Sequence, residues 1–359
     1  MGFDLSFSVI KIAVMASSGF LFAFLITPWL TNILYKHRLW RKSVRQTALG
    51  GGTVPIFQKF HHKGEVQTPR FGGVLIWLTP PALALLFFGF EHLNFLSRSE
   101  TWLPLATLVA ASTVGFLDDI LQVISAPSNA FLRSLWERIN KYTAGGLSLK
   151  LRFGLIALIG LVGAWWFFYK LGWDTVFVPG FGDIFIGWLM IPFFLVVMLA
   201  TYSGGVIDGI DGLSGGAFAS IFTAYGLIAF SQGQVDLAAF CFALVGSILA
   251  FLWFNIPPAR FYMGEVGMMG LTTTLTVVTF LTDSVLVLPI IGFLLVIESG
   301  SVILQLLSKK FRGGKKIFLA APIHHHFEAL GWPAYKVTMR FWVIGIVAAF
   351  VGVAIRLLG

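Results

Sequence analysis

The chain has 359 residues, of which 57% are hydrophobic and only 11% are charged, and its mean hydropathy is +0.86. A soluble domain carries about a quarter charged residues, so this composition excludes the soluble class and indicates a polytopic membrane protein. The net charge of +9 fits orientation in a membrane and contact with anionic lipid, so nucleic acid need not be invoked. The single cysteine, Cys241, excludes an intrachain disulfide.

Windows of about 20 apolar residues mark membrane-spanning helices. The first window is too long for a signal peptide, and it contains Pro28, which favours a kink. The ten windows are 8–35, 72–90, 101–117, 153–171, 184–202, 213–231, 236–255, 267–282, 285–308 and 340–358. We therefore predict an all-α integral membrane protein, one polytopic domain over 1–359 with about ten transmembrane helices.

The loops between these windows differ in charge. Taken alternately, one set holds all but four of the 25 Lys and Arg residues. The four exceptions are Lys11, Arg98, Lys170 and Arg356. Because basic loops stay in the cytoplasm, the rich set marks the cytoplasmic face, and ten spans then place both termini outside.

Two loops contain structure of their own. In the outer loop 173–186, two β-rich runs flank Pro179-Gly180, which predicts a small periplasmic hairpin. In the inner loop, 128–142 places its apolar residues on one helical face, and Ser128 fits as its N-cap. That pattern predicts an interfacial helix on the cytoplasmic membrane surface.

The most unusual segment is 203–216, where two acids stand among six glycines between apolar windows. Asp208 and Asp211 are three residues apart, so on a helix they share a face. An intramembrane charge costs ~2.5–3.5 kcal/mol, so such acids are usually functional. The glycines alone also fit helix packing, because they form small-xxx-small pairs, which are Gly205 with Gly209 and Gly212 with Gly216.

Other acids stand at the inner ends of the predicted helices. Asp118 and Asp119 end the third window, Glu265 precedes the eighth, and Glu298 lies inside the ninth. Carboxylates brought to one depth suit Mg²⁺, which binds one or two carboxylates plus substrate phosphates. The alternatives are a solvated loop start for the aspartate pair and a structural hydrogen bond for Glu298.

The inner loops also carry cations and a histidine triplet. Cations around acids suit a polyanionic phosphate, although each one also fits a role in topology alone. They are Lys59, Lys63, Arg70, Lys150, Arg152 and those of 309–316. Consecutive helical residues point about 100° apart, so the three histidines of 322–328 cannot share one ion. They fit phosphate or sugar binding better than zinc, and the bland alternative is an interfacial cluster without a role.

Six motifs run in order along nearly the whole chain. They are Thr-Pro-Arg-Phe-Gly-Gly (68–73), Phe-Leu-Asp-Asp (116–119), Asp-Gly-Ile-Asp-Gly-Leu (208–213), Leu-Trp-Phe-Asn (252–255), Tyr-Met-Gly-Glu (262–265) and Ala-Pro-Ile-His-His-His-Phe-Glu (321–328). Together they resemble the phospho-N-acetylmuramoyl-pentapeptide transferase family, within the polyprenyl-phosphate N-acetylhexosamine-1-phosphate transferase superfamily. The histidine triplet is the most specific of them.

The resemblance implies transfer of phospho-MurNAc-pentapeptide from its UDP carrier to undecaprenyl phosphate, giving lipid I and UMP in peptidoglycan synthesis. It implies Mg²⁺ as cofactor, a cytoplasmic cleft in the bacterial cytoplasmic membrane, a broken ninth helix and a homodimer. The expected partners are UDP-MurNAc-pentapeptide, undecaprenyl phosphate and membrane lipid, without nucleic acid.

Matching positions imply roles. The expected catalytic residues are Asp118, Asp119, Asp208 and His324, and the expected metal ligands are Glu265 and Asp208. The expected substrate-binding residues are Lys63, Arg70, Arg152, Asp211, Tyr262, His325 and His326, with Tyr262 stacking on uracil. The departures from the family pattern are Gly205 for Asn, Glu65 for Lys, Arg70 for Thr, Gln122 and Ala126 for Lys, and Glu265 for Asp. We therefore expect rearranged nucleotide and diphosphate contacts.

Two routes and two rival functions stay open. Asp118 is expected to orient or deprotonate the lipid phosphate, and both direct attack and an aspartyl-phosphate intermediate fit. The nearer rival is a related GlcNAc-1-phosphate transferase, against which the histidine triplet argues. The other is a proton-coupled secondary transporter with Asp208, Asp211 and Glu298 as a relay. Acids gathered at one membrane face favour the enzyme.

Overall fold

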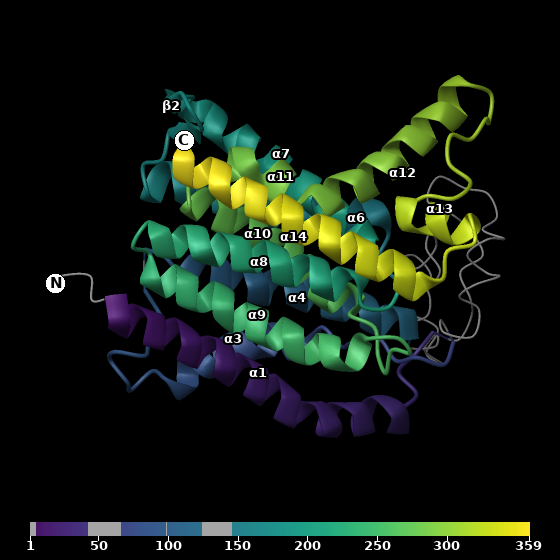
Figure 1. The fold of residues 1–359 in the computed structure, drawn as a ribbon, viewed down its shortest axis with the longest axis horizontal. Helices are drawn as coiled ribbons and strands as arrows, with labels where there is room; N and C mark the ends of the chain where they lie inside the picture. Colours follow the sequence, from purple (N-terminus) through teal and green to yellow (C-terminus); the bar gives the residue numbers. More distant parts are fainter. Residues whose placement is uncertain (1–4, 42–65, 98, 124–145) are drawn as a thin grey trace, which may run out of the picture.

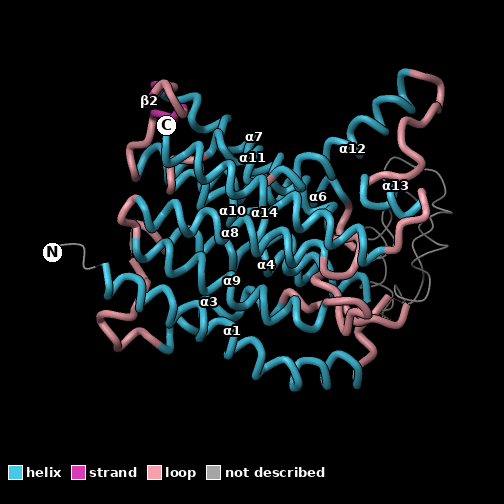
Figure 2. Tube along the Cα trace, in the orientation of Figure 1, coloured by secondary structure: helices cyan, strands magenta, loops and turns pink. Residues whose placement is uncertain are grey.

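The structure, a computed structural model, describes residues 5–41, 66–97, 99–123 and 146–359. Long helices run side by side, and the loops that connect them gather at the two ends of the bundle (Figures 1 and 2). The longer helices are α1 (Leu5–Lys36), α3 (Val74–Leu86), α4 (Trp102–Val123), α6 (Leu149–Trp165), α7 (Met190–Ser203), α8 (Leu213–Ser231), α9 (Val235–Asn255), α10 (Gly264–Leu281), α12 (Phe293–Phe311) and α14 (Ala334–Leu358). The short ones are α11 (Leu288–Ile291) and α13 (Ile323–Ala329). The start of α1 and the end of α14 lie at the same end of the bundle (Figure 1).

Among the described residues, eight helices are long and apolar enough to cross a bilayer, and a ninth crossing arises if α11 and α12 are counted together. The predicted class, an all-α multi-pass membrane protein, is therefore confirmed. The window 72–90 contains α3, which has only 13 residues and includes Pro80 and Pro81. A straight crossing needs about 20 residues, so a tenth span at this window stays a prediction.

The chain bends sharply inside the predicted window 285–308. The pair Val285–Ile291 and Phe293–Phe311 meets at 79°. Pro289 stands at the start of α11 and Gly292 follows its end, so two helix-disrupting residues flank this short piece. This bend corresponds to the broken ninth helix that the family resemblance implies.

The prediction that Asp208 and Asp211 share one helical face is wrong, because the helix ends before them. The 3-10 turn Gly204–Ile207 extends α7, Asp208 then leaves helical geometry (φ −77°, ψ 63°), and α8 begins only at Leu213. Gly212 has φ +77°, a left-handed conformation that glycine adopts without a steric penalty. The two acids therefore lie in a turn between two helices.

Helix α10 lies at the centre of the bundle, and every residue in it except Glu265 is buried. Its threonine hydroxyls largely bond carbonyls three or four residues back, which satisfies them without water; one example is Thr273 with Met269 at 2.7 Å. Helix α4 approaches it closely because Gly115 has no side chain, and a Cβ there would overlap the backbone carbonyl of Glu265. This contact places the aspartate pair of α4 beside the start of α10.

The predicted hairpin is present. Strands β1 (Thr175–Val178) and β2 (Gly182–Phe185) pair antiparallel, with Thr175 opposite Phe185 and Val178 opposite Gly182. Its position on the periplasmic side stays a prediction. The predicted interfacial helix 128–142 lies outside the described residues.

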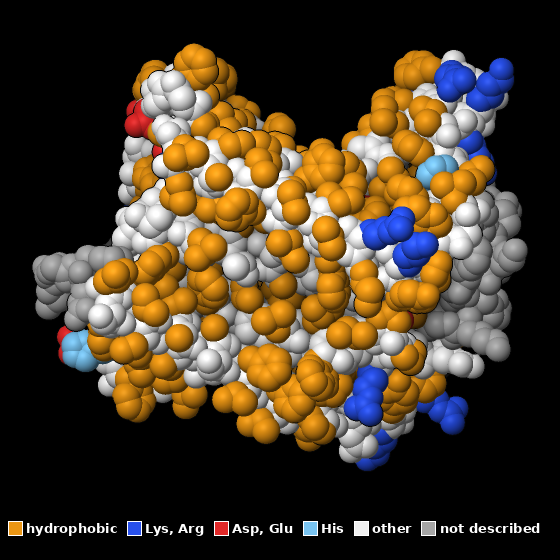
Figure 3. All heavy atoms as spheres, in the orientation of Figure 1, with side chains coloured by type: hydrophobic (Ala, Val, Ile, Leu, Met, Phe, Trp, Pro, Cys, Tyr) orange, Lys and Arg blue, Asp and Glu red, His pale blue; other side chains and the backbone are white. Residues whose placement is uncertain are grey.

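The surface is divided by charge. On the face drawn in Figure 3, hydrophobic side chains cover the middle of the bundle, while Lys and Arg gather at the end away from the termini. Exposed cations of the described chain at that end are Lys36, Arg38, Lys150, Arg260, Lys310, Arg312, Lys315, Lys316, Lys336 and Arg340. The bundle thus has one strongly basic end.

Candidate active site

Four carboxylates and two guanidinium groups meet near the end of α4, the starts of α6 and α10, and the turn between α7 and α8. They are Asp118, Asp119, Asp208, Glu265, Arg70 and Arg152. The charges of Asp119, Asp208 and Glu265 all act on the guanidinium of Arg70. The structure therefore brings together most of the residues predicted as catalytic or metal-binding, from segments distant in the sequence.

Asp118 is completely buried, and both of its oxygens are engaged. Its Oδ1 accepts the Leu147 N–H at 2.5 Å, and its Oδ2 accepts Gln122 Nε2 at 2.7 Å. Arg152 Nε lies 3.3 Å from Oδ1 and supplies positive charge. Because burying an unpaired carboxylate is costly, these three groups are what keep it in place.

Asp119 is also completely buried. The Val266 N–H donates to its Oδ2 at 2.9 Å, and Arg70 Nε donates to its Oδ1 at 3.3 Å. The sequence placed Arg70 among the cations of an inner loop, but its side chain is only 14% exposed. In this structure Arg70 therefore forms a largely buried ion pair, and its contact with substrate stays a prediction.

Glu265 and Arg152 complete the link between α6 and α10. Ser148 caps α6 by accepting the Leu151 N–H, which sets Arg152 in the first turn of this helix. Arg152 Nη1 donates to Glu265 Oε1 at 2.6 Å. The Glu265 side chain keeps 24% of its surface exposed, so an incoming ligand can still reach it.

The turn between α7 and α8 holds two acids in different environments. Ser214 donates to Asp208 Oδ1 at 2.8 Å, yet burial raises the pKa of Asp208 to about 6. Asp211 Oδ2 accepts the Ala259 N–H at 3.0 Å, and its backbone carbonyl accepts Thr338 Oγ1 at 3.0 Å. Asp208 thus faces the charged cluster, whereas Asp211 ties the turn to neighbouring loops and to α14.

The carboxylates of the cluster fit Mg²⁺ only if phosphate oxygens of a substrate complete its coordination. In the described chain, no three His, Cys, Asp or Glu residues converge to hold an ion. Carboxylate oxygens are nevertheless the ligands Mg²⁺ prefers, and it commonly takes only one or two from protein. If all four carboxylates are ionised, they exceed the two arginines by two negative charges. Glu265 and Asp208 are the two that keep some exposure.

The backbone of Tyr262 is hydrogen-bonded to the segment 69–72. Its backbone N–H donates to Pro69 O at 2.8 Å, and its carbonyl accepts the Gly72 N–H at 2.8 Å. Burial raises the pKa of Tyr262 to about 12, so the phenol is neutral near pH 7. Stacking on a base stays a prediction, and Lys63 lies outside the described residues.

The three histidines have three different partners, as their helical spacing predicted. His324 Nδ1 lies 2.8 Å from Glu298 Oε2, and His325 Nδ1 lies 2.6 Å from Glu328 Oε2. His326 Nδ1 accepts the Leu319 N–H at 3.2 Å. His324 lies against Gly209, in the turn that carries the two acids.

Two side-chain contacts of the site were not predicted from the sequence. Arg41 Nε donates to Gln122 Oε1 at 2.9 Å, so Gln122 connects a buried arginine to Asp118. Glu298 pairs with His324, although they belong to different helices. In the sequence, the only signals for these contacts were a basic residue shortly after the first apolar window for Arg41 and an acid within an apolar window for Glu298.

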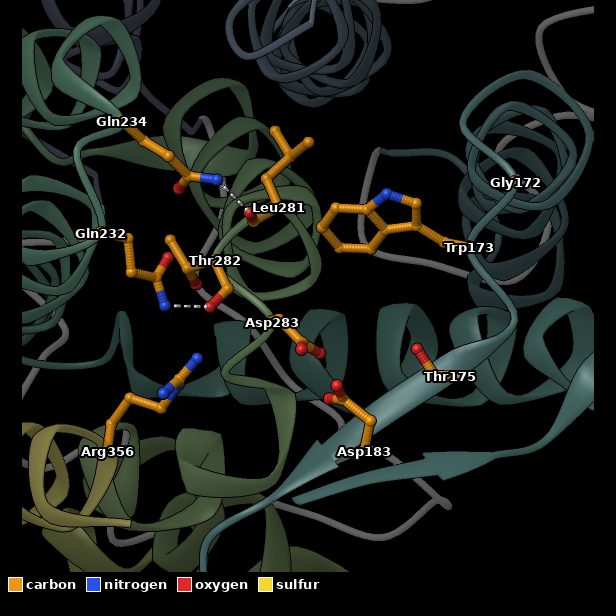
Figure 4. Close-up of a pocket in the computed structure, with 10 residues that line it drawn as sticks. All are labelled: Gly172, Trp173, Thr175, Asp183, Gln232, Gln234, Leu281, Thr282, Asp283 and Arg356. Carbon is orange, nitrogen blue, oxygen red and sulfur yellow. Dashed lines mark hydrogen bonds between the residues drawn. The ribbon is translucent and has the colours of Figure 1, made fainter.

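A separate cavity of about 370 Å³ lies at the opposite end of the bundle, between the hairpin, the α8–α9 turn and the end of α14 (Figure 4). Asp183, Asp283 and Arg356 line it, and Gln232 and Gln234 donate to backbone carbonyls at its edge. None of the predicted site residues contributes to it. The charged cluster at the other end is therefore the candidate active site.

Comparison with known proteins identifies the family of the chain. Residues 101–283 match the model of glycosyl transferase family 4, a stretch that contains Asp118, Asp208 and Glu265. A protein of Listeria innocua serovar 6a named phospho-N-acetylmuramoyl-pentapeptide-transferase is 37% identical over 298 residues, 82% of this chain and 86% of the relative. A Chloroflexus aggregans protein of the same name is 30% identical over 358 residues, 96% of this chain and 89% of the relative. The chain therefore belongs to glycosyl transferase family 4 and, within it, to the phospho-N-acetylmuramoyl-pentapeptide transferases.

Proposed function

We propose that this protein transfers phospho-MurNAc-pentapeptide from UDP to undecaprenyl phosphate, giving lipid I and UMP in peptidoglycan synthesis. The name of its relatives supports this reaction. The observation that carries the proposal is the cluster of four carboxylates around two arginines at the basic end of the bundle. Such a mixture of cations and metal-binding oxygens suits a diphosphate substrate.

The membrane arrangement is part of the proposal. Ten helices cross the bacterial cytoplasmic membrane, both termini lie outside, and the charged cluster faces the cytoplasm. The gathering of Lys and Arg at the end away from the termini supports this orientation (Figure 3). We also propose, from the family resemblance, that the protein forms a homodimer in lipid.

The reaction requires that the lipid phosphate be positioned and that its negative charge be neutralised, more than it requires a strong base. A phosphate monoester has a second pKa of about 6, so the lipid phosphate is already a dianion near pH 7. Arg70 and Arg152 are held within the cluster by buried carboxylates and would supply the positive charge for a polyanion there. Mg²⁺, held by Glu265 and Asp208, would neutralise charge on the diphosphate and the leaving UMP.

The environment of the aspartate pair favours direct attack by the lipid phosphate. An aspartyl-phosphate on Asp118 or Asp119 would first have to break a hydrogen bond, since every carboxylate oxygen of the two is engaged. Both residues instead hold an arginine in place. We therefore favour Asp118 as the residue that orients the lipid phosphate, through Arg152.

A UMP-release assay with purified protein tests the proposal. With Mg²⁺ and undecaprenyl phosphate, UDP-MurNAc-pentapeptide should release UMP, and UDP-GlcNAc should not. Release from UDP-GlcNAc alone would support the GlcNAc-1-phosphate transferase instead. No release from either donor, together with proton-coupled uptake in vesicles, would support the transporter.

A further inference from the structure

Glu298 and His324 form a pair that lies inside the protein, beside the turn that carries Asp208. Glu298 is on α12 and His324 is in the first turn of α13, and neither side chain is exposed at all. Glu298 Oε2 and His324 Nδ1 are 2.8 Å apart, so one proton is shared between them. A buried acid inside an apolar helix is costly and is usually kept for function.

The pair leaves two polar atoms without partners. Among the described residues, Glu298 Oε1 and His324 Nε2 are both buried and make no hydrogen bond. Buried N–H groups without an acceptor are rarer in proteins than under-satisfied acceptors. With the shared proton on Nδ1, His324 Nε2 carries no proton, and both unsatisfied atoms are acceptors. This arrangement therefore avoids a buried N–H without an acceptor.

The bare nitrogen faces the acid-bearing turn. His324 Nε2 lies against Gly209, and a Cβ built on Gly209 would overlap it. Gly209 stands directly after Asp208 and two residues before Asp211. Glycine is therefore the residue that lets the imidazole approach this turn.

Helix α12 carries Glu298 and also packs against the segment that precedes Asp208. Leu295 packs against Gly204 in the 3-10 turn that precedes Asp208, and Ser299 Oγ lies 3.2 Å from Ser203 Oγ. Glu298 is adjacent to Ser299 on the same helix. The carboxylate that holds His324 is thus fixed relative to the segment that carries the acids.

We propose that Glu298 is a positioning residue, which holds His324 Nδ1–H so that Nε2 stays a free acceptor for a hydroxyl or N–H group of the nucleotide-sugar substrate. This inference rests on the proposed transferase function. It adds a role for an intramembrane acid whose ion-pair partner in the described chain is His324. An outer hydrogen bond that fixes the tautomer of a functional histidine is a recurring device in enzymes.

Glu298→Gln tests the proposal with little change of volume. Its amide can donate to Nδ1, which moves the ring proton to Nε2 and turns the acceptor into a donor. We expect kcat/KM for the nucleotide sugar to fall about 10–100-fold, the scale for such outer partners. The KM for undecaprenyl phosphate should stay unchanged. Unchanged kcat/KM in a folded Glu298→Gln protein would overturn the proposal.

A matched control is available at the other end of the bundle. Asp236 also belongs to a partly buried pair, with Lys11 Nζ 2.5 Å away, but lies far from the site. Asp236→Asn should lower thermal stability without changing the kcat/KM of the folded protein. An equal loss of kcat/KM in both variants would show that destabilisation, and not positioning, explains the effect, and would overturn the proposal.

A measurement without turnover separates this proposal from the proposed function. The chain has seven histidines, so ¹⁵N-histidine labelling with His324→Gln for assignment can report both ring nitrogens of His324. The proposal requires a proton on Nδ1 and none on Nε2 in the substrate-free protein. A proton on Nε2 would overturn it, whether or not the protein releases UMP.

Discussion

Arg152 and Glu265 are 113 residues apart in the chain, yet Arg152 Nη1 lies 2.6 Å from Glu265 Oε1. This contact joins the first turn of α6 to the first turn of α10. It means that the expected metal ligand already has a cation as its partner. A bound divalent ion would therefore share Glu265 with Arg152 or displace it toward the substrate.

Glu265→Gln should abolish Mg²⁺-dependent turnover while the protein remains folded. The amide is a weaker ligand than a carboxylate, and it no longer balances the charge of Arg152. Glu265→Asp should retain part of the activity at raised Mg²⁺, because the shorter carboxylate still carries the charge. UMP release measured over a Mg²⁺ series, with thermal melts, checks both variants. Near-normal Glu265→Gln activity at ordinary Mg²⁺ would argue against this role.

Asp208→Asn should lose at least ~100-fold in kcat, the scale for one preorganised electrostatic group. An interaction made in the transition state affects kcat and kcat/KM together. Lys63→Ala is the comparison, and it should mainly raise KM. Arg70→Ala is unsuitable as a second comparison, because it would leave the buried Asp119 without its cation. If Asp208→Asn raises only KM while Lys63→Ala loses kcat, the 59–70 loop carries the chemistry.

In the metal-free protein at high pH, Asp208→Asn should raise the free energy of unfolding. Burial raises the pKa of Asp208 from its ordinary 3.8 to about 6, so between these values the folded chain binds more protons than the unfolded chain. Stability therefore falls as pH rises through this window, and the full penalty remains above pH 6. Asp208→Asn removes that penalty.

Thermal melts in the presence of a chelator check this. Asp208→Asn should melt a few degrees above the unsubstituted protein at pH 8, and the difference should vanish near pH 4. A variant that melts lower than the unsubstituted protein at pH 8 would show that the ionised carboxylate stabilises the fold. Ser214 remains as hydrogen-bond donor in both proteins.

The proposed topology predicts which side of the membrane a new cysteine faces. The natural Cys241 is buried, so Cys241→Ala provides the background. Lys315→Cys, in the exposed loop after α12, should react with an impermeant maleimide only after the membrane is opened. Phe181→Cys, at the 87% exposed tip of the hairpin, should react in intact cells. Labelling of Lys315→Cys from outside would show that the orientation is the opposite of the proposed one.

The class of the fold could be predicted because apolar windows and loop charge are local properties of the sequence. The windows located the helices, and the two β-rich runs around Pro179-Gly180 located the hairpin. The windows 184–202 and 213–231 left a break around Asp208, but the spacing of the two acids alone suggested a shared helical face; in the structure the 3-10 turn ends at Ile207, and Gly212 at φ +77° precedes α8. The shortness of α3 was missed because hydropathy does not report where a helix stops.

The residue types of the site could be predicted, but their partners could not. Asp118, Asp119 and Glu265 stood out as acids at helix ends. Nothing local shows that Arg70 is buried against Asp119, or that Arg152 joins Asp118 to Glu265. These pairs arise from the close approach of α4 and α10, which Gly115 permits. Such contacts depend on the tertiary arrangement of the helices.

The most direct test of the central claim is the identity of the lipid product. Purified protein with Mg²⁺, UDP-MurNAc-pentapeptide and undecaprenyl phosphate should yield one new lipid, which mass spectrometry of the organic extract identifies. We predict undecaprenyl diphosphate carrying MurNAc-pentapeptide, formed in equal amount to UMP. UMP without this lipid, or a lipid that carries the sugar through a single phosphate, would contradict the proposed reaction.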